Sequence, residues 1–288
     1  MRLGGRRESQ NVEDRRRMGG TAKAGVGGIG GIIILGLITW LMGGNPLDAI
    51  QQAGGLGQLK GQTEAQGREF SREEEELAKF SRQVLAGTED VWTEVFAKMG
   101  REYVPPTLVL FTGSVNSACG SATAAVGPFY CSGDQKLYID LSFFSQMKSQ
   151  LGAGGDFAYA YVIAHEVGHH VEHLLGTLGQ AHANMERQSK EEANRTSVRL
   201  ELLADYYAGV WAHHDNKMFG SIEDGDIEEA VNCAHQIGDN YLQEKARGYS
   251  QPESFTHGSS EQRMRWLKRG LETGDMEATT FGVPFGDL

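Results

Sequence analysis

The sequence has no surplus of basic residues and very few cysteines. Its 27 Lys and Arg are outnumbered by 38 Asp and Glu, which gives a net charge of −11. Residues 1–23 hold seven basic and three acidic side chains, so the rest of the chain carries −15. A nucleic-acid-binding domain presents a basic face, so this function class is excluded and no nucleic-acid partner is expected. Three cysteines leave room for one disulfide at most.

No internal repeat is visible, and 288 residues suffice for one domain of catalytic size with appendages. Changes in composition along the chain divide it into segments. We predict a basic cytoplasmic N-terminus at 1–23, a transmembrane segment at 24–44, a flexible linker rich in Gly and Gln at 45–69, and a catalytic domain at 70–288.

The segment 24–44 lacks charged residues altogether. Its twenty-one residues, with the apolar run IGGIIILGLITWLM, match the ~20 needed to cross a bilayer as a helix. A cleaved signal peptide is the alternative, but the following MGGNPLDAI has no clear cleavage site, which favours an uncleaved signal anchor. Basic residues precede the segment. We therefore expect a single-pass protein of the cell membrane, with its N-terminus in the cytoplasm and its catalytic domain outside.

Cys119 and Cys131 bracket the short loop CGSATAAVGPFYC. Outside the cytoplasm this pair can close as a disulfide, and C-x11-C is not a usual zinc spacing. We therefore predict a disulfide between Cys119 and Cys131. Cys233 lies in a helical stretch and is interpreted as a buried apolar residue.

Apolar spacing predicts a small sheet followed by a helical majority. A first helical stretch at 70–99 is expected to be interrupted at Gly87 and Thr88. Strands are predicted at 107–111, 127–131 and 136–141, and helices at 142–151, 156–175, 195–214, 226–247 and 259–271. The expected fold class is α+β, mainly helical with a small β-sheet.

The helix predicted over 156–175 contains the stretch YVIAHEVGHHVEHLLG. His165 and His169 are four residues apart, so their side chains lie on one helix face and can reach one metal ion. Glu166 follows the first histidine and lies beside the metal rather than on it. This is the H-E-x-x-H pattern of zinc proteases, in which the glutamate is the general base. A solvated histidine-rich helix is the alternative, and the apolar flanks disfavour it.

Three further polar residues in this stretch are assigned neither to the metal nor to the water: His170, Glu172 and His173. His170 points about 100° away from the ligand face. His173 continues the row of His165 and His169 and could line the cleft, although a packing or supporting role is favoured.

A third metal ligand must come from elsewhere in the chain. The extended pattern H-E-x-x-H-x-x-G-x-x-H fails, because the chain has Glu172 and Leu175 where it needs glycine and histidine. A later helix, RLELLADYYAG, places Glu201 and Asp205 four residues apart among leucines and tyrosines. Acids in so apolar a helix need a partner. Glu201 is therefore the predicted ligand, and Asp205 the predicted hydrogen-bond acceptor behind a ligand histidine.

Together, HEVGHH, ELLADYYAG and SFTHGSSEQRMRWLKRG (254–270) resemble the bacterial putative neutral zinc metallopeptidases. These are gluzincin-type proteins akin to the membrane CAAX-prenyl proteases and heat-shock proteases. CGSATAAVGPFYC followed by KLYIDLSFF fits the same family, and the resemblance covers residues 70–285. It implies a gluzincin-like metallopeptidase domain with one Zn²⁺ per chain. In that domain His165, His169 and Glu201 hold the metal, Glu166 is catalytic and Asp205 supports the site.

In the related proteases a histidine and an arginine six residues later lie beside the substrate carbonyl. His257 and Arg263 have this spacing, although HG replaces the more usual HP here. The resemblance therefore adds these two residues to the candidate catalytic groups.

We predict a membrane-anchored zinc peptidase in which Glu166 activates a metal-bound water for attack on a peptide bond. A zinc-binding scaffold without catalytic activity, which binds a partner at the membrane, is the alternative; a zinc hydrolase of other substrates is a third. The hairpin predicted from 127–131 and 136–141 could offer an edge strand to an extended protein or peptide substrate.

Overall fold

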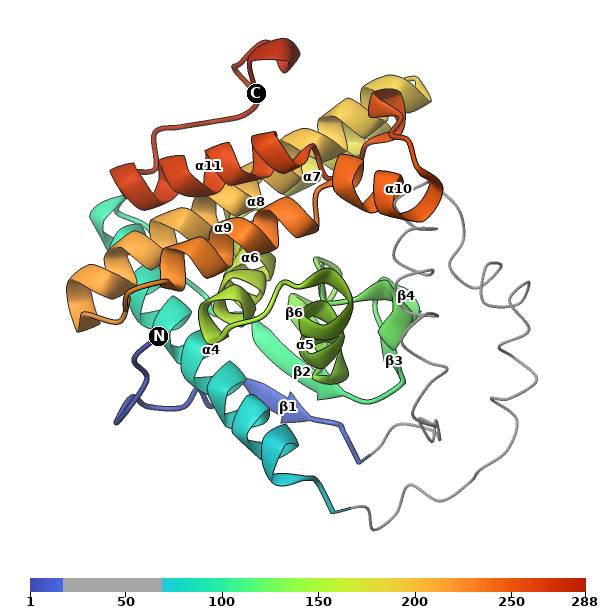
Figure 1. Ribbon diagram of the computed structural model, residues 1–288. Helices are drawn as coiled ribbons and strands as arrows, with labels where there is room; N and C mark the ends of the chain where they lie inside the picture. The colour runs from blue at the N-terminus through green and yellow to red at the C-terminus, as the bar shows by residue number, and fades with distance from the viewer. Residues whose placement is uncertain (18–68) are drawn as a thin grey trace.

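The computed structural model describes residues 1–17 and 69–288, which form a helical layer beside a small sheet (Figure 1). The predicted α+β class with a helical majority is confirmed. The helices are α4 (Arg72–Lys98), α5 (Ser142–Gln146) with a π turn (Met147–Leu151), α6 (Asp156–Leu175), α7 (Thr177–Met185), α8 (Lys190–Phe219), α9 (Asp226–Gln236), α10 (Asp239–Arg247) and α11 (Ser260–Thr273). The strands are β1 (Val12–Asp14), β2 (Thr107–Phe111), β3 (Ser114–Ser117), β4 (Gly120–Thr123), β5 (Phe129–Cys131) and β6 (Lys136–Asp140).

The main sheet has the strand order β1-β2-β6-β5, with β5 antiparallel to β6 and the other pairs parallel. The predicted β5–β6 hairpin is therefore confirmed, and β5 is an edge strand of the sheet. Alternate residues of a strand point to opposite faces. Leu108 and Leu110 accordingly join the main core under the helices, whereas Val109 and Phe111 join a smaller core on the other face.

The smaller core is covered by a β3–β4 hairpin that the sequence analysis did not predict. Its strands, SVNS and GSAT, are short and polar and carry no alternating apolar pattern. Val115 is the one residue of this hairpin that the smaller core buries, with Ala122 half-buried against it. Strand signals based on apolar alternation cannot detect such a segment.

Residues 1–17 lie against the rest of the domain. β1 pairs with β2 in parallel register, and Val12 lies opposite Leu108. Arg6 forms a two-bonded ion pair with buried Asp215 of α8, at 2.6 and 2.9 Å. Residues 1–23 were predicted to be a separate cytoplasmic segment, and that location stays a prediction. Within this segment Arg6 and Arg7 pair with acidic side chains of the domain.

The expected break at Gly87 is wrong, because α4 runs unbroken through it. A side chain at this position would meet Arg6 Nη2 at 2.6 Å and Asp215 Oδ1 at 2.8 Å. Gly87 therefore makes room for the Arg6–Asp215 pair rather than ending the helix. Such a role depends on contacts between segments far apart in the sequence.

The predicted helix over 156–175 is confirmed with these bounds, and it ends at Gly176 in the left-handed conformation. The helix predicted over 226–247 is two helices, α9 and α10, which are separated at Ile237 and Gly238. A side chain on Gly238 would meet the backbone nitrogen of Ser260 at 2.5 Å, so the break brings the start of α11 close to the start of α10.

Within 1–17 and 69–288, no helix is both long and apolar enough to cross a membrane. The predicted span at 24–44, and all but the last residue of the predicted linker at 45–69, lie outside the described residues.

Candidate metal centre

Two helices carry the predicted metal ligands and cross at a glycine. A side chain on Gly168 of α6 would lie 2.8 Å from the carbonyl oxygen of Ala204 on α8. Only glycine therefore lets the two backbones approach this closely. Gly168 lies inside HEVGH, and the sequence alone did not indicate this role for it. The close approach brings Glu201 within reach of both histidines of α6.

The structure brings His165, His169 and Glu201 together. The Nε2 atom of His165 lies 3.2 Å from Glu201 Oε2, and that of His169 lies 3.5 Å from Glu201 Oε1. One potential ligand atom from each residue lies within 4.8 Å of the others. Two imidazole nitrogens and a carboxylate oxygen that face one point are a donor set that suits Zn²⁺ and leaves a further position open. The residues present thus fit the predicted metal.

Asp205 accepts a hydrogen bond from the His165 ring nitrogen that faces away from the metal position. Its carboxylate accepts from His165 Nδ1 at 2.8 Å, from the Tyr161 hydroxyl at 2.5 Å and from Arg263 Nε at 2.8 Å. With Nδ1 bonded in this way, Nε2 of His165 is left to face the metal position. Burial raises the pKa of Asp205, but Arg263 and His165 outweigh burial and lower it to about 2. Asp205 therefore lies where the sequence analysis expected it.

Glu172 holds His169 in the same way, which the sequence analysis missed. Its Oε2 lies 2.9 Å from His169 Nδ1, and its side chain is fully buried. Each histidine of the H-E-x-x-H pattern is thus backed by a carboxylate, Asp205 from α8 and Glu172 from α6 itself. The sequence contains a signal for this supporting role, because Glu172 follows the ligand histidine by three residues on an otherwise apolar helix.

Acidic neighbours change the protonation of the two histidines. Burial lowers the pKa of His165, but Asp205 and Glu201 outweigh burial and raise it to about 9. The pKa of His169 is also raised well above its ordinary value, because Glu201 and Glu172 outweigh burial. Without a metal the site therefore holds protons, which a metal ion must displace to bind.

Glu166 lies beside the three ligands and lines the cleft above them. It is buried, and burial raises the pKa of its carboxyl group in spite of the nearby His165 and His169. No hydrogen bond between Glu166 and another described side chain occupies its carboxylate. A carboxylate with a raised pKa beside a metal position suits the exchange of a proton with water.

His257 reaches the cleft from the loop before α11. The Oδ2 atom of buried Asp239 accepts hydrogen bonds from three successive backbone N–H groups of this loop, those of Thr256, His257 and Gly258, at 2.7 to 3.0 Å. Burial raises the pKa of Glu201, but His257 and His169 outweigh it and hold that pKa well below its ordinary value. His257 thus lines the same cleft as the predicted ligands, and Asp239 is a supporting residue that was not predicted from the sequence.

Arg263 lines the same cleft, but its guanidinium is largely occupied. It donates to both oxygens of Asp205, to the Tyr161 hydroxyl at 3.3 Å and to the carbonyl of Ile237 at 3.4 Å. The side chain is buried. This geometry favours a role in fixing Asp205, and so His165, over the predicted contact with the substrate carbonyl.

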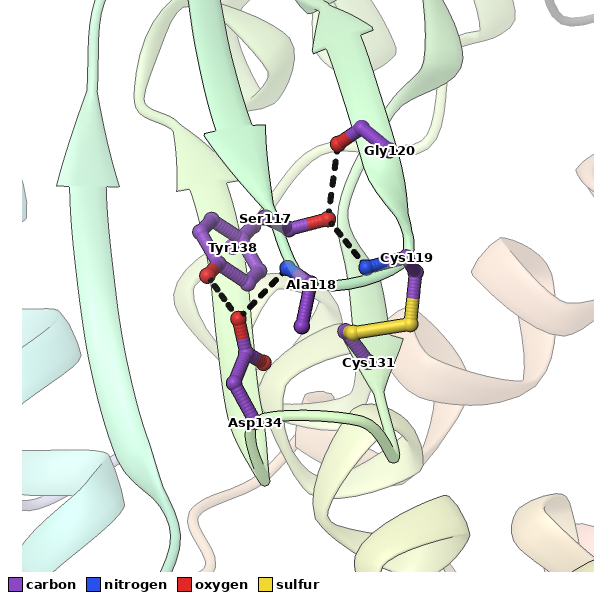
Figure 2. The surroundings of a disulfide bond; sticks show 7 residues. All are labelled: Ser117, Ala118, Cys119, Gly120, Cys131, Asp134 and Tyr138. Atoms are coloured by element: carbon purple, nitrogen blue, oxygen red, sulfur yellow. Dashed lines mark hydrogen bonds between the residues drawn. A yellow bond between two sulfur atoms is a disulfide. The ribbon is translucent and has the colours of Figure 1, made fainter.

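The metal position lies in a cleft of about 790 Å³. One side is formed by α6, α7 and α8; the other by β5 and the β3–β4 hairpin. The predicted disulfide between Cys119 and Cys131 is confirmed and ties the turn of this hairpin to β5 (Figure 2). Figure 2 also shows Asp134, which accepts from the Tyr138 hydroxyl at 2.6 Å and from the backbone of Ala118 at 3.0 Å.

Comparison with known proteins finds one relative along nearly the whole chain and another along about 60% of it. The chain is 46% identical to the uncharacterized protein YpfJ of Escherichia coli strain K12 over 299 aligned positions, which cover 98% of this chain and 99% of YpfJ. It is 42% identical over 183 positions to the uncharacterized protein Mb2605 of Mycobacterium bovis, which cover 60% of this chain and 61% of Mb2605. No solved structure matches.

The sequence profile of one family matches residues 1–281, which include all seven predicted site residues and the N-terminal strand β1. That family is described as "Putative neutral zinc metallopeptidase". The description agrees with a donor set of two histidines and a glutamate on crossed helices. The chain belongs to this family of zinc metallopeptidases.

Proposed function

We propose that the protein is a zinc-dependent peptidase that hydrolyses peptide bonds of extended substrates. One observation carries the proposal: His165, His169 and Glu201 face one point on the wall of a large cleft, with Glu166 beside them. Metal ligands, a neighbouring base and room for a substrate are the requirements of metal-assisted hydrolysis.

The chain's own residues support each proton transfer. Zn²⁺ held by His165, His169 and Glu201 would supply Lewis acidity, which acidifies a water molecule and polarises the scissile carbonyl. Glu166 takes the proton from the attacking water and then passes it to the leaving amine. His257, which lines the same cleft, would donate a hydrogen bond to the oxygen of the scissile carbonyl as negative charge develops there.

The edge strand β5 supports an extended peptide as the substrate. It lines the cleft, and β6 is its neighbour in the sheet on one side only. A peptide that adds to the free edge gains main-chain hydrogen bonds without regard to its sequence. Residues 127–131 should then contact peptide-like inhibitors, and a complex structure in which the inhibitor lies elsewhere in the cleft would contradict this placement.

The disulfide supports a working place outside the reducing cytoplasm. Cys119 is exposed and Cys131 is buried, so in a reducing compartment the disulfide would be open to thiol exchange from the side of Cys119. Protein isolated from cells under thiol-blocking conditions should carry no label at these two residues. Labelling of both residues would place the domain in a reducing compartment.

The test of the function compares zinc content and cleavage in matched variants. The wild type should bind one Zn²⁺ and cleave an unstructured protein, Glu166→Gln should keep the metal and lose cleavage, and Glu201→Ala should lose both. Zinc retention without cleavage of any member of a broad peptide library would support the alternative, a zinc-binding scaffold without catalytic activity. Equal cleavage by the wild type and Glu166→Gln would overturn the mechanism.

A further inference from the structure

His170 follows the ligand His169 directly but takes no part in the metal site. Its ring is fully buried on the other side of α6. Nε2 lies 2.7 Å from the carbonyl oxygen of Val104, and Nδ1 lies 2.9 Å from the hydroxyl of Tyr130. A carbonyl oxygen can only accept, so Nε2 carries the proton. In the neutral ring Nδ1 is then the acceptor, and the Tyr130 hydroxyl donates to it.

Tyr130 is the central residue of β5, and its side chain points toward α6. Its neighbours Phe129 and Cys131 point to the opposite face, where they join the smaller core and the disulfide. The ring of Tyr130 lies 5.4 Å from that of His170 and 6.2 Å from that of His173. Tyr130 also lines the cleft and packs against the cluster of Leu178 and Leu200.

The Tyr130–His170 hydrogen bond therefore joins the two sides of the cleft. One partner lies on the edge strand, and the other lies on the helix that carries His165, Glu166 and His169. A peptide bound to β5 must present its carbonyl to the metal position, so the separation of β5 from α6 decides whether both contacts form at once. A side-chain link between these two elements fixes that separation directly.

We infer that His170 and Tyr130 are positioning residues that hold the edge strand β5 at the distance from α6 at which an extended peptide reaches the metal. The inference rests on the proposed function and assigns a role to two residues outside the metal site. Two adjacent residues thus have different roles: His169 binds the metal, and His170 holds the substrate-binding edge.

Two isosteric variants of His170 test this role. In His170→Asn the amide oxygen lies near the former Nδ1 and can still accept from Tyr130, whereas in His170→Gln the amide nitrogen lies near the former Nε2 and keeps only the bond to Val104. Tyr130→Phe removes the hydroxyl alone. His170→Gln should therefore behave like Tyr130→Phe, and His170→Asn should remain close to the wild type.

Binding is measured on zinc-loaded Glu166→Gln protein, so that turnover is not needed. The probes are a tripeptide hydroxamate, which spans the metal and the β5 edge, and acetohydroxamate, which reaches the metal alone. Loss of one neutral hydrogen bond should weaken the tripeptide probe by about threefold to tenfold in Tyr130→Phe and His170→Gln. Acetohydroxamate affinity and zinc content should stay unchanged. In active protein the same two variants should raise KM more than they lower kcat.

Hydrogen–deuterium exchange of the metal-free protein gives a readout that requires neither substrate nor metal. The amides of residues 129–131 should exchange faster in Tyr130→Phe and His170→Gln than in His170→Asn. Unchanged tripeptide affinity in both disrupting variants would overturn the inference, as would a parallel loss of acetohydroxamate binding. If the wild type binds both probes but cleaves no peptide, the proposed function fails, while the positioning role is still decided by these affinities.

Discussion

The two sides of the cleft are built differently. On the helical side, α6, α8 and α11 share a buried network in which Asp205 accepts hydrogen bonds from His165, Tyr161 and Arg263. On the sheet side, the β3–β4 hairpin and β5 are held by pairing with β6, a small separate core, one disulfide, the bond from Ala118 to Asp134 and the packing and hydrogen bond of Tyr130. The predicted metal ligands are thus fixed by a buried ionic network, and the proposed substrate-binding edge by pairing on one side and by single links.

This difference matches what metal binding and peptide binding each require. Metal ligands must hold a fixed geometry, and carboxylates behind them maintain it. A strand that binds varied peptides by main-chain hydrogen bonds needs an accessible edge, and contacts on that edge would block it. We therefore expect substitutions on the helical side to affect stability and metal affinity. Substitutions on the sheet side should affect peptide binding and local opening.

The largest expected effect comes from breaking the buried ion pair on the helical side. Arg263→Ala leaves the Asp205 carboxylate buried without its cation, so the free energy of unfolding should fall by about 3–5 kcal/mol. Lys268→Ala, at an exposed position of the same helix, should change it by less than about 0.5 kcal/mol. Urea denaturation of the metal-free protein measures both. Similar values for the two variants would show that Asp205 does not depend on Arg263.

A somewhat smaller effect is expected on the sheet side. The Cys119–Cys131 bridge closes a loop with a sequence separation of 12, and its removal in the Cys119→Ser, Cys131→Ser double variant should destabilise the protein by about 3 kcal/mol. Proteolysis should then occur first within residues 114–123. Zinc affinity should not change, because the disulfide touches no ligand. A marked loss of zinc would mean that the two sides are not independent.

The hydrogen bond between Tyr130 and His170, which joins the two sides of the cleft, should weaken at low pH. Burial lowers the pKa of His170 to about 4, although its bond to Val104 opposes this shift. Between pH 6.5 and 4 the unfolded chain therefore binds more protons at this residue than the folded protein does, and stability falls as pH falls. From pH 7.5 to 5.0 the wild type should lose about 2 kcal/mol more than His170→Asn, measured by urea denaturation without metal. Equal losses would show that His170 does not stay neutral.

The smallest expected effect concerns the carboxylate behind His169. Glu172→Ala should weaken zinc binding by about tenfold, because Nδ1 of His169 loses its acceptor. His173→Ala, one residue further along the helix, should leave zinc affinity unchanged. Competition with a chromogenic chelator measures both affinities. Equal affinity in the wild type and Glu172→Ala would mean that Glu172 does not orient His169.

Local spacing in the sequence is enough to predict the groups closest to the chemistry. His165 and His169 share a helix face by their spacing, and Glu201 and Asp205 stand out as acids on an apolar helix. The structure brings these four side chains together. The fold class followed from the same kind of pattern, since helices and strands with regular apolar spacing are detected and the polar β3–β4 hairpin is not.

Residues that act through tertiary contacts could not be predicted in this way. Gly168 matters because Ala204 lies against it, and Gly87 because Arg6 and Asp215 do. Asp239 is needed for a loop that begins seventeen residues later in the chain, at Thr256. In each case the partner is distant in the sequence, so no local period marks the residue.

The pairing of β1 with β2 has a consequence for where residues 1–17 lie relative to a membrane. Two strands that pair in one sheet must lie in the same compartment, and β1 and β2 pair with Val12 opposite Leu108. The single crossing predicted for 24–44 stays a prediction, and it would require β1 and β2 to lie on opposite sides of the membrane. Cysteines placed at exposed Gln10 and Lys268 should therefore react alike with a membrane-impermeant reagent on intact cells. Opposite reactivity would mean that β1 leaves the sheet when the protein meets a membrane.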